Sequence, residues 1–261
     1  MRILKKSLGQ NFLVDKNIIN KIINLIEVKN KNILEIGPGN GALTDQILKK
    51  KPKSLILIEK DFFFANKLKT KYSKNKSIKV LNYDILKFEL GKVIKKETII
   101  FGNLPYNISS QILVKILKLD RKKSQYGDLI FMFQKELGEK IIGRYPSKNY
   151  GRLAILSNYK LDIYKKFFVS SNCFFPKPKV TSIVIHFRPK KKYLTKIKNI
   201  NNLEKITNNF FSNKRKMINK SIKKLLNKKK LSHLTDLNLK LRPSDISPEM
   251  YYKITELYER D

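Results

Sequence analysis

The stretch Asn32-Ile33-Leu34-Glu35-Ile36-Gly37-Pro38-Gly39-Asn40-Gly41 decides the fold of this chain. Its first half is a short apolar run, which is typical of a strand that is buried on both faces. Its second half holds three glycines and leads into a helix predicted over 42–50. Glycine permits a tight turn and lets a ligand approach the backbone closely. A strand, a glycine-rich turn and a helix in this order predict a nucleotide-binding loop.

The rest of the first 190 residues alternates between apolar runs and helical patterns. Strands are predicted over 54–59, 78–82, 98–102 and 128–134, and helices over 15–27, 62–71, 135–142 and from Ser109 onward. Such alternation indicates a parallel sheet with helices on both faces. The segments 159–169 and 180–187 are expected to close the sheet as a pair of strands. The sequence therefore predicts an α/β, Rossmann-like fold.

The character of the chain changes near Lys190, where lysine and asparagine begin to dominate. Helical patterns follow over 203–211, 214–226 and 248–258. We expect a catalytic domain over 1–190 and a small, basic, all-helical domain over 191–261, with 190–199 as the linker.

Composition restricts the partner class. The 261 residues include 57 Lys and Arg against 21 Asp and Glu, a formal charge of +36. Nucleic acid or an anionic membrane is the natural partner of such a surface. A bias towards Lys, Asn and Ile, as AT-rich coding produces, would inflate the size of the charge. One cysteine and two histidines exclude a Cys/His zinc site, and no apolar run is long enough for a membrane span or a secretory signal. We expect a cytoplasmic protein without a metal.

Acidic residues near the glycine turn indicate the cofactor. Glu59 ends the strand after the turn, where a carboxylate would bind ribose hydroxyls. That pattern is compatible with NAD. Two details favour S-adenosylmethionine, which carries positive charge and no phosphate: Glu35 precedes the first glycine, and no third glycine has the pyrophosphate-binding spacing. Asp84 ends a further strand, where it would accept the cofactor's adenine amine or merely cap a turn.

The segment Asn103-Leu104-Pro105-Tyr106 leaves a buried strand in an unusual way. Pro105 fixes its own φ and pushes Leu104 towards an extended conformation. The Asn103 side chain and the nearby carbonyls are thus held beside the flat ring of Tyr106. This arrangement suits a planar ring with an exocyclic amine. We expect the Asn103 side-chain oxygen and the Pro105 carbonyl to accept its two N–H groups.

Taken together, these segments resemble the ribosomal RNA adenine dimethyltransferases of the KsgA type, and the resemblance spans nearly the whole chain. The segments that carry it are Ser7–Leu13, Glu35–Gly41, Glu59 with Asp61, Tyr83-Asp84, Phe101–Ser109, Tyr150–Leu153 and Phe174–Ser182. The resemblance implies a class I methyltransferase sheet and S-adenosylmethionine as the methyl donor. It also implies that Asn11 and Leu13 close over the cofactor and that Gly37, Gly39, Glu59, Asp84 and Asn103 line its site.

For the substrate, the resemblance implies that the target adenine is flipped between Tyr106 and an aromatic residue of the later motif. Alignment of that motif selects Phe174, although the adjacent Phe175 leaves an ambiguity; we expect Phe175 to pack in the core. The implied reaction is N6-dimethylation of two adjacent adenines in a 3′-terminal hairpin of 16S rRNA, with a role in late small-subunit maturation. The implied partner is the pre-30S particle, bound by a monomer.

Basic residues are expected to contact the RNA. Arg152 and Lys179 belong to motifs near the predicted cleft, and Lys214, Arg215 and Lys216 begin a predicted helix whose alternative interpretation is a solvated lysine-rich face.

Two other functions stay open. A noncatalytic ribosome assembly factor would use the same surface. An NAD-dependent oxidoreductase is disfavoured by Asn103–Tyr106. A large-subunit resistance enzyme is a relative, but Leu241–Ser247 favours the small-subunit branch.

Overall fold

The computed structural model describes residues 11–119, 125–192 and 195–260. These residues form two compact units, and each is described here by itself. Of the described residues, the first unit contains 11–138 and 163–189, and the second contains 139–162 and 190–260. Residues 7–10, the first part of the Ser7–Leu13 segment that carries the resemblance, lie outside the described residues.

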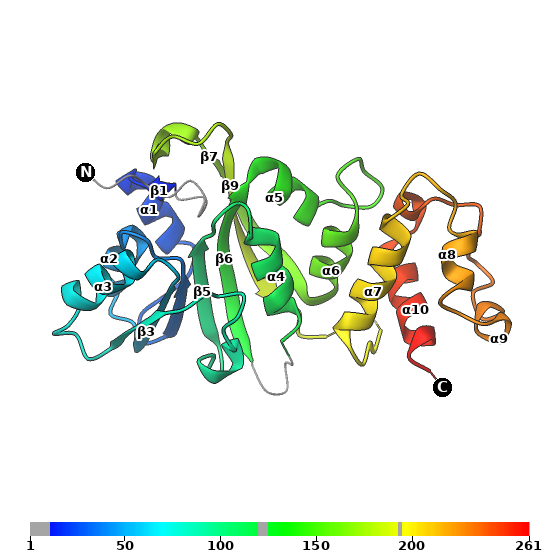
Figure 1. Ribbon diagram of the computed structural model, residues 1–261, viewed down its shortest axis with the longest axis horizontal. Coiled ribbons are helices and arrows are strands. Elements are labelled where there is room, and N and C mark those ends of the chain that lie inside the picture. The colour runs from blue at the N-terminus through cyan, green and yellow to red at the C-terminus, as the bar shows by residue number, and fades with distance from the viewer. Residues whose placement is uncertain (1–10, 120–124, 193–194, 261) are drawn as a thin grey trace. The chain divides into compact units, whose positions relative to one another are not determined.

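A seven-stranded sheet forms the centre of the fold, in the order β4-β3-β2-β5-β6-β9-β7. Strands β2 to β6 run parallel to their neighbours, whereas β9 pairs antiparallel with β6. Figure 1 shows β5, β6 and β9 side by side. The bounds are β2 Asn32–Ile36, β3 Ser54–Glu59, β4 Ile78–Asn82, β5 Thr98–Asn103, β6 Tyr126–Gln134, β7 Leu161–Val169 and β9 Ser182–Pro189. The predicted strands are confirmed to within a few residues at each end.

A second, two-stranded sheet joins distant segments. Strand β1, Phe12–Leu13, pairs antiparallel with β8, Phe174–Phe175, so that Leu13 lies opposite Phe174. The pairing continues past β1, because the Val14 N–H donates to the carbonyl of Cys173 over 2.9 Å. Sequence patterns do not reveal this pairing, because each strand has two residues.

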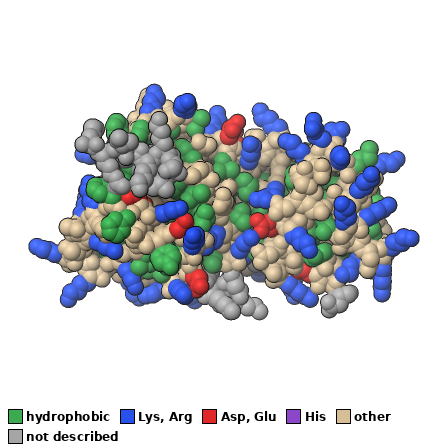
Figure 2. Space-filling model, in the orientation of Figure 1, with side chains coloured by type: hydrophobic (Ala, Val, Ile, Leu, Met, Phe, Trp, Pro, Cys, Tyr) green, Lys and Arg blue, Asp and Glu red, His purple; other side chains and the backbone are tan. Residues whose placement is uncertain are grey.

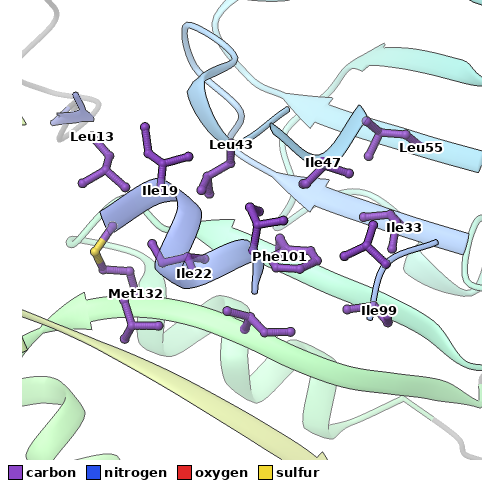
Figure 3. Close-up of a cluster of buried hydrophobic side chains, with 14 of the residues drawn as sticks. Leu13, Ile19, Ile22, Ile33, Leu43, Ile47, Leu55, Ile99, Phe101 and Met132 are labelled. Atoms are coloured by element: carbon purple, nitrogen blue, oxygen red, sulfur yellow. The ribbon is translucent and has the colours of Figure 1, made fainter. Parts of the chain in front are cut away.

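Helices of the first unit bury apolar stripes against the large sheet. They are α1 Lys16–Ile23, α2 Ala42–Lys49, α3 Phe62–Lys71 and α4 Ser109–Leu117, and α5 Lys135–Ile141 follows β6. Asp15 caps α1 by accepting the N–H groups of Asn17 and Ile18. Figure 3 shows Ile19 and Ile22 of α1 packed with Phe101 of β5 and Met132 of β6. This core supports the strands whose ends carry the site.

The second unit is mostly helical. It contains α6 Arg152–Lys160, α7 Ile200–Phe211, α8 Asn219–Lys223, α9 Lys228–Leu231 and α10 Pro248–Tyr258 (Figure 1). Helix α6 was not predicted, and it packs with α7 and α10: the Tyr252 hydroxyl donates to the Ile155 carbonyl over 3.0 Å. A short 3-10 turn occurs in this unit at Pro243–Asp245, and two occur in the first unit, at Leu90–Lys92 and Ser171–Cys173. The compact units thus differ from the predicted division at residue 190, because 139–162 joins the helical unit.

Candidate active site

A pocket opens at the carboxyl ends of β2, β3 and β5, where parallel sheets usually bind ligands. All of its lining residues belong to the first unit. They come from four places: the β1 segment (Asn11–Leu13), the glycine turn and start of α2 (Glu35–Asn40, Ala42, Leu43), the end of β3 with the β4 turn (Ile58–Lys60, Tyr83, Ile85) and the β5 turn (Asn103–Ile108). The structure therefore brings together Asn11, Leu13, Gly37, Gly39, Glu59, Asn103, Pro105 and Tyr106 of the predicted site.

The glycine turn needs its glycines. Gly37, Gly39 and Gly41 have φ values of +67°, +55° and +86°, a region that other residues rarely adopt. A Cβ on Gly39 would lie 2.7 Å from the ring of Phe12. The turn and the β1 segment are therefore in close contact, so the side of the pocket formed by Phe12 depends on a glycine at position 39.

Glu59 ties the end of β3 to the glycine turn. Its carboxylate accepts the Gly39 N–H over 3.0 Å and the Asp61 N–H over 2.8 Å. Burial raises the pKa of Glu59, and these two hydrogen bonds oppose that rise. Each oxygen keeps a second lone pair. The side chain can thus still accept from a pair of hydroxyl groups, as the ribose prediction requires.

Glu35 is a second acid in the pocket wall, and it is buried. One of its oxygens accepts the Thr44 hydroxyl over 2.7 Å. Burial raises the pKa of Glu35 from 4.5 to about 8, and the nearby carboxylates of Glu59 and Asp45 add to the rise. A bound cation would favour the ionised form of this acid. The two acids therefore suit a positively charged, phosphate-free cofactor such as S-adenosylmethionine.

Asn103 is oriented by a backbone contact from the far N-terminal segment. Its Nδ2 donates to the carbonyl of Asn11 over 3.0 Å. Since the amide nitrogen is occupied there, Oδ1 is the side-chain atom of this pocket-lining residue that is available to accept. This assignment of nitrogen and oxygen follows from the hydrogen-bond geometry. Asn11 thus contributes its main chain, whereas the resemblance implied only that it covers the cofactor.

The carbonyl groups of the β5 turn differ in their partners. The Pro105 carbonyl, which was predicted to accept the substrate amine, already accepts the N–H of Ile108 over 3.1 Å. No hydrogen bond among the described residues uses the carbonyl of Leu104. A carbonyl oxygen has two lone pairs, so Pro105 can accept once more. Leu104 offers an acceptor without such competition.

Tyr106 is fixed by a residue of β9 that the sequence did not single out. Its hydroxyl forms a 2.6 Å hydrogen bond with the hydroxyl of Ser182, which is fully buried. Burial raises the pKa of Tyr106. The bond holds one end of the ring, so the ring keeps a defined orientation at the pocket wall. Nothing in the local sequence around either residue indicates this contact.

The two phenylalanines of β8 have the opposite burial to the prediction. Phe174 is 4% exposed and belongs to the core cluster with Leu13, whereas Phe175 is 57% exposed. The expectation that Phe175 packs in the core is therefore wrong. The cause is the pairing register with β1, which turns Phe174 inward beside Leu13. Neither ring lines the pocket itself.

Asp84 does not line the pocket, although its neighbours Tyr83 and Ile85 do. One of its oxygens pairs with the Lys60 ammonium over 2.8 Å, and the other accepts the Leu86 N–H over 2.9 Å. The hydrogen bond from Lys60 lowers the pKa of Asp84. The carboxylate is thus a turn cap and an ion-pair partner at the pocket edge, which keeps it ionised.

The predicted RNA contacts lie in different environments. Lys179 is exposed in the first unit. Arg152 begins α6 in the second unit and donates to the side chain of Asn208. Lys214, Arg215 and Lys216 lie on an exposed turn between α7 and α8 instead of the predicted helix, because α7 ends at Phe211. In Figure 2, Lys and Arg side chains are scattered over the visible face, between hydrophobic and other groups, and do not gather in one patch.

Within the described ranges, no group of three or more His, Cys, Asp or Glu side chains could hold a metal ion. None of the helices in the described part of the chain combines the length and the hydropathy that a bilayer span requires.

Comparison with known proteins agrees with this geometry. The family described as ribosomal RNA adenine dimethylase matches residues 1–260. A ribosomal RNA small subunit methyltransferase A of Pelagibacter ubique is 43% identical over 98% of this chain and 97% of its own length. The corresponding protein of Malacoplasma penetrans is 38% identical over 95% and 90%.

Solved structures agree as well. A dimethyladenosine transferase from Plasmodium falciparum has a TM-score of 0.78 at 25% identity and covers 93% of this chain and 95% of its own. The 23S rRNA methyltransferase ErmE shares the fold, with a TM-score of 0.69 at 23% identity over 95% of this chain and 100% of its own. These findings remove the oxidoreductase interpretation. The chain belongs to the ribosomal RNA adenine dimethylase family, and it is an S-adenosylmethionine-dependent rRNA adenine dimethyltransferase.

Proposed function

We propose that this enzyme dimethylates N6 of two adjacent adenines in a 3′-terminal hairpin of small-subunit rRNA, acting as a monomer on the pre-30S particle during late maturation. The observation that carries the chemistry is the hydrogen bond from Asn103 Nδ2 to the Asn11 carbonyl, which leaves Oδ1 available to accept in a residue that lines the pocket. The small-subunit target is supported by the names of relatives that are 38–43% identical over nearly the full chain.

The amine of adenine is a weak nucleophile because its lone pair is delocalised into the ring. Oδ1 of Asn103 accepts one N–H of this amine, and a carbonyl of the turn accepts the other. We assign the second acceptor to Leu104, because the Pro105 carbonyl already accepts the Ile108 N–H. Two such acceptors favour a pyramidal nitrogen whose lone pair points at the methyl donor. Asn103 is neutral and adds no formal charge, so its contribution is position.

The cofactor supplies an electrophilic methyl group on a sulfonium. Glu59 accepts the ribose hydroxyls, while Glu35 provides negative charge in the wall. The β1 segment, with Asn11 and Leu13, covers the bound molecule. Gly37 and Gly39 permit close approach of the backbone, and Asp84 accepts the adenine amine after sharing or displacing Lys60. The lining of the pocket and the contacts of Glu59 support these roles for every residue except Asp84, whose role rests on its place between the lining residues Tyr83 and Ile85.

The flipped adenine stacks on Tyr106, whose hydroxyl is held by Ser182. The second ring is supplied by the Phe174–Phe175 pair. We favour Phe175, because Phe174 would have to leave the core cluster to reach a base. Stacking of this kind contributes roughly 1–3 kcal/mol per base and offsets the cost of extruding the base from its stack.

Arg152, Lys179 and the Lys214–Lys216 turn bind phosphates of the same RNA. The formal charge of +36 supports this assignment, and a steep fall of affinity with salt would follow from it. A noncatalytic role in assembly uses the same surface and can coexist with methyl transfer.

The test uses small subunits or rRNA that lack the modification. These are incubated with the protein and labelled S-adenosylmethionine, and the modified nucleotides are located by mass spectrometry. Two adjacent N6-dimethyladenines near the 3′ end are expected. Label on large-subunit RNA alone would contradict the proposed target, and an absence of label on adenine would contradict the proposed reaction. Asn103→Ala is the inactive control.

A further inference from the structure

We propose that Arg188 of β9, the strand next to the edge strand β7 of the large sheet, is a preorganised binding site for a phosphate of the RNA that flanks the target adenines. This inference rests on the proposed function and extends it to a surface outside the pocket. None of the motifs that predicted the site includes Arg188.

Three strands hold the Arg188 side chain in place. Its guanidinium lies over the ring of Tyr164 from β7, 3.4 Å from the ring centre. Its Nε donates to Asp128 of β6 over 3.3 Å. Asp128 is in turn bound by the fully buried His186, with Nε2 2.5 Å from the same carboxylate oxygen, and His186 meets the Tyr164 ring edge-on.

Arg188 remains 47% exposed despite these contacts. Stacking on a ring and pairing through Nε fix the plane of the guanidinium, so less side-chain entropy is lost when it binds a ligand. Among the described residues, no hydrogen bond engages its two terminal nitrogens. Two parallel N–H groups of arginine match the geometry of a phosphate.

Neighbouring residues make an anion the fitting ligand. Lys165 lies 5.4 Å from the Tyr164 ring centre, and Lys166 is exposed beside it. Strand β7 is the terminal strand of the sheet, so its outer edge has no neighbouring strand among the described residues. Lysines on an edge strand also prevent unwanted strand pairing, but that role does not require an arginine whose side chain is held by Tyr164 and Asp128.

The position of Arg188 along β9 indicates which part of the RNA it would contact. Ser182, which touches Tyr106, and Arg188 lie on the same strand, β9, six residues apart. A strand rises about 3.3 Å per residue, so the two are separated by about 20 Å. An RNA phosphate at Arg188 is therefore several nucleotides from the base at Tyr106, in the stem that carries the target loop.

The experiment compares Arg188→Ala with Lys79→Ala. Lys79 is an exposed cation on β4, the opposite edge strand of the same sheet, and it controls for the general loss of one charge. Binding of a long target hairpin is measured as a function of salt, together with binding of a hairpin whose stem is truncated near the loop. Methylation kinetics and binding of S-adenosylhomocysteine are measured for the same variants.

For Arg188→Ala we expect roughly a tenfold loss of affinity for the long hairpin and a salt slope that is smaller by about one, since one phosphate contact is lost. The KM for the RNA should rise while kcat and the affinity for S-adenosylhomocysteine stay unchanged. The truncated hairpin should bind both variants equally. Arg188→Lys should recover only part of the affinity, because lysine lacks the planar geometry, and Tyr164→Ala should reproduce part of the loss.

If Arg188→Ala matches Lys79→Ala in affinity and slope, the phosphate site is refuted while the proposed function stands. An equal loss on both hairpins would also overturn it, because the contact would then not lie in the stem. If the wild-type enzyme fails to methylate small-subunit rRNA, the proposed function fails first, and that outcome is distinguishable because it does not involve Arg188.

Discussion

The amide nitrogen of Asn103 donates a hydrogen bond to the main-chain carbonyl of Asn11 over 3.0 Å, across 92 residues of sequence. This bond joins the Asn11–Leu13 segment of the pocket wall to the side chain that we propose as the acceptor of the substrate amine. Because Asn11 adjoins β1, and β1 pairs with β8, the orientation of Asn103 depends on two segments that are far from it in the chain.

Replacing Asn103 tests this orientation. Asn103→Ala should lower kcat by roughly 100-fold, since a positioned polar group is removed, while the affinity for S-adenosylhomocysteine changes by less than about threefold. Asn103→Asp should also be slow, because an oxygen would then face the Asn11 carbonyl. Asn20→Ala, on the exposed side of α1, is the matched control. Near wild-type turnover of Asn103→Ala would contradict the assignment.

The Tyr106–Ser182 hydrogen bond should couple the effects of substitutions at these two residues on stability. Tyr106→Phe leaves the fully buried Ser182 hydroxyl without its partner, which costs about 1–3 kcal/mol of unfolding free energy. Ser182→Ala leaves the hydroxyl of the half-buried Tyr106 without its partner and should cost less. The double variant should lose less than the sum of the two single losses, because no unpaired hydroxyl remains. Denaturant unfolding of all four proteins measures this difference, and strict additivity would argue against the bond.

The two phenylalanines of β8 should separate stability from activity. Phe174→Ala removes a buried ring and should lower the free energy of unfolding by about 3–5 kcal/mol. Phe175→Ala alters an exposed ring, so its stability should change by less than about 0.5 kcal/mol while methylation of RNA falls. If Phe175→Ala is fully active, the stacking ring must be Phe174 or must be absent.

The raised pKa of Glu35 implies that the free energy of unfolding depends on pH. Its pKa in the folded chain is about 8, above the ordinary value of 4.5. The folded state therefore binds this proton more tightly than the unfolded state does. The contribution of this proton to the free energy of unfolding is therefore complete below pH 4.5. It is lost as the pH rises towards 8, by at most about 1.4 kcal/mol per pH unit.

Glu35→Gln keeps the shape of the side chain and removes the titration. The difference in unfolding free energy between wild type and Glu35→Gln, measured without cofactor, should thus shift against the wild type between pH 5 and 8. A constant difference over this range would refute the raised pKa.

Gly39→Ala tests the turn. The new Cβ would meet the Phe12 ring at 2.7 Å, and φ is +55°. We expect about 1–2 kcal/mol of backbone strain and weaker binding of S-adenosylhomocysteine, because Phe12 must move. Gly151→Ala is the control for stability: its φ is extended and the added Cβ would be 3.7 Å from Phe211. Equal effects in the two variants would count against the close contact.

Local sequence was sufficient for most elements of the sheet and for part of the pocket wall, namely the glycine turn, Glu59 and the Asn103–Tyr106 turn. The runs at Asn32–Ile36, Ser54–Glu59 and Ile78–Asn82 match strands without change, since apolar periodicity directly reports burial on a sheet. The turns that follow these strands lie at one edge of a parallel sheet, so Gly39, Glu59 and Asn103 converge there for topological reasons. Helix α6 escaped prediction because its apolar residues show no clear one-sided stripe.

Contacts across long sequence separations were decided by the tertiary structure alone. The register of β1 with β8 turned Phe174 inward and Phe175 outward, although the two residues are identical and adjacent. The partners Asn11 of Asn103 and Ser182 of Tyr106 are 92 and 76 residues away. Side-chain orientation depends on which neighbour packing brings within about 3 Å. Thus the sequence by itself determined the α/β fold, the family and the list of candidate groups, whereas the tertiary structure decided their partners, because packing brings together atoms that lie far apart in the chain.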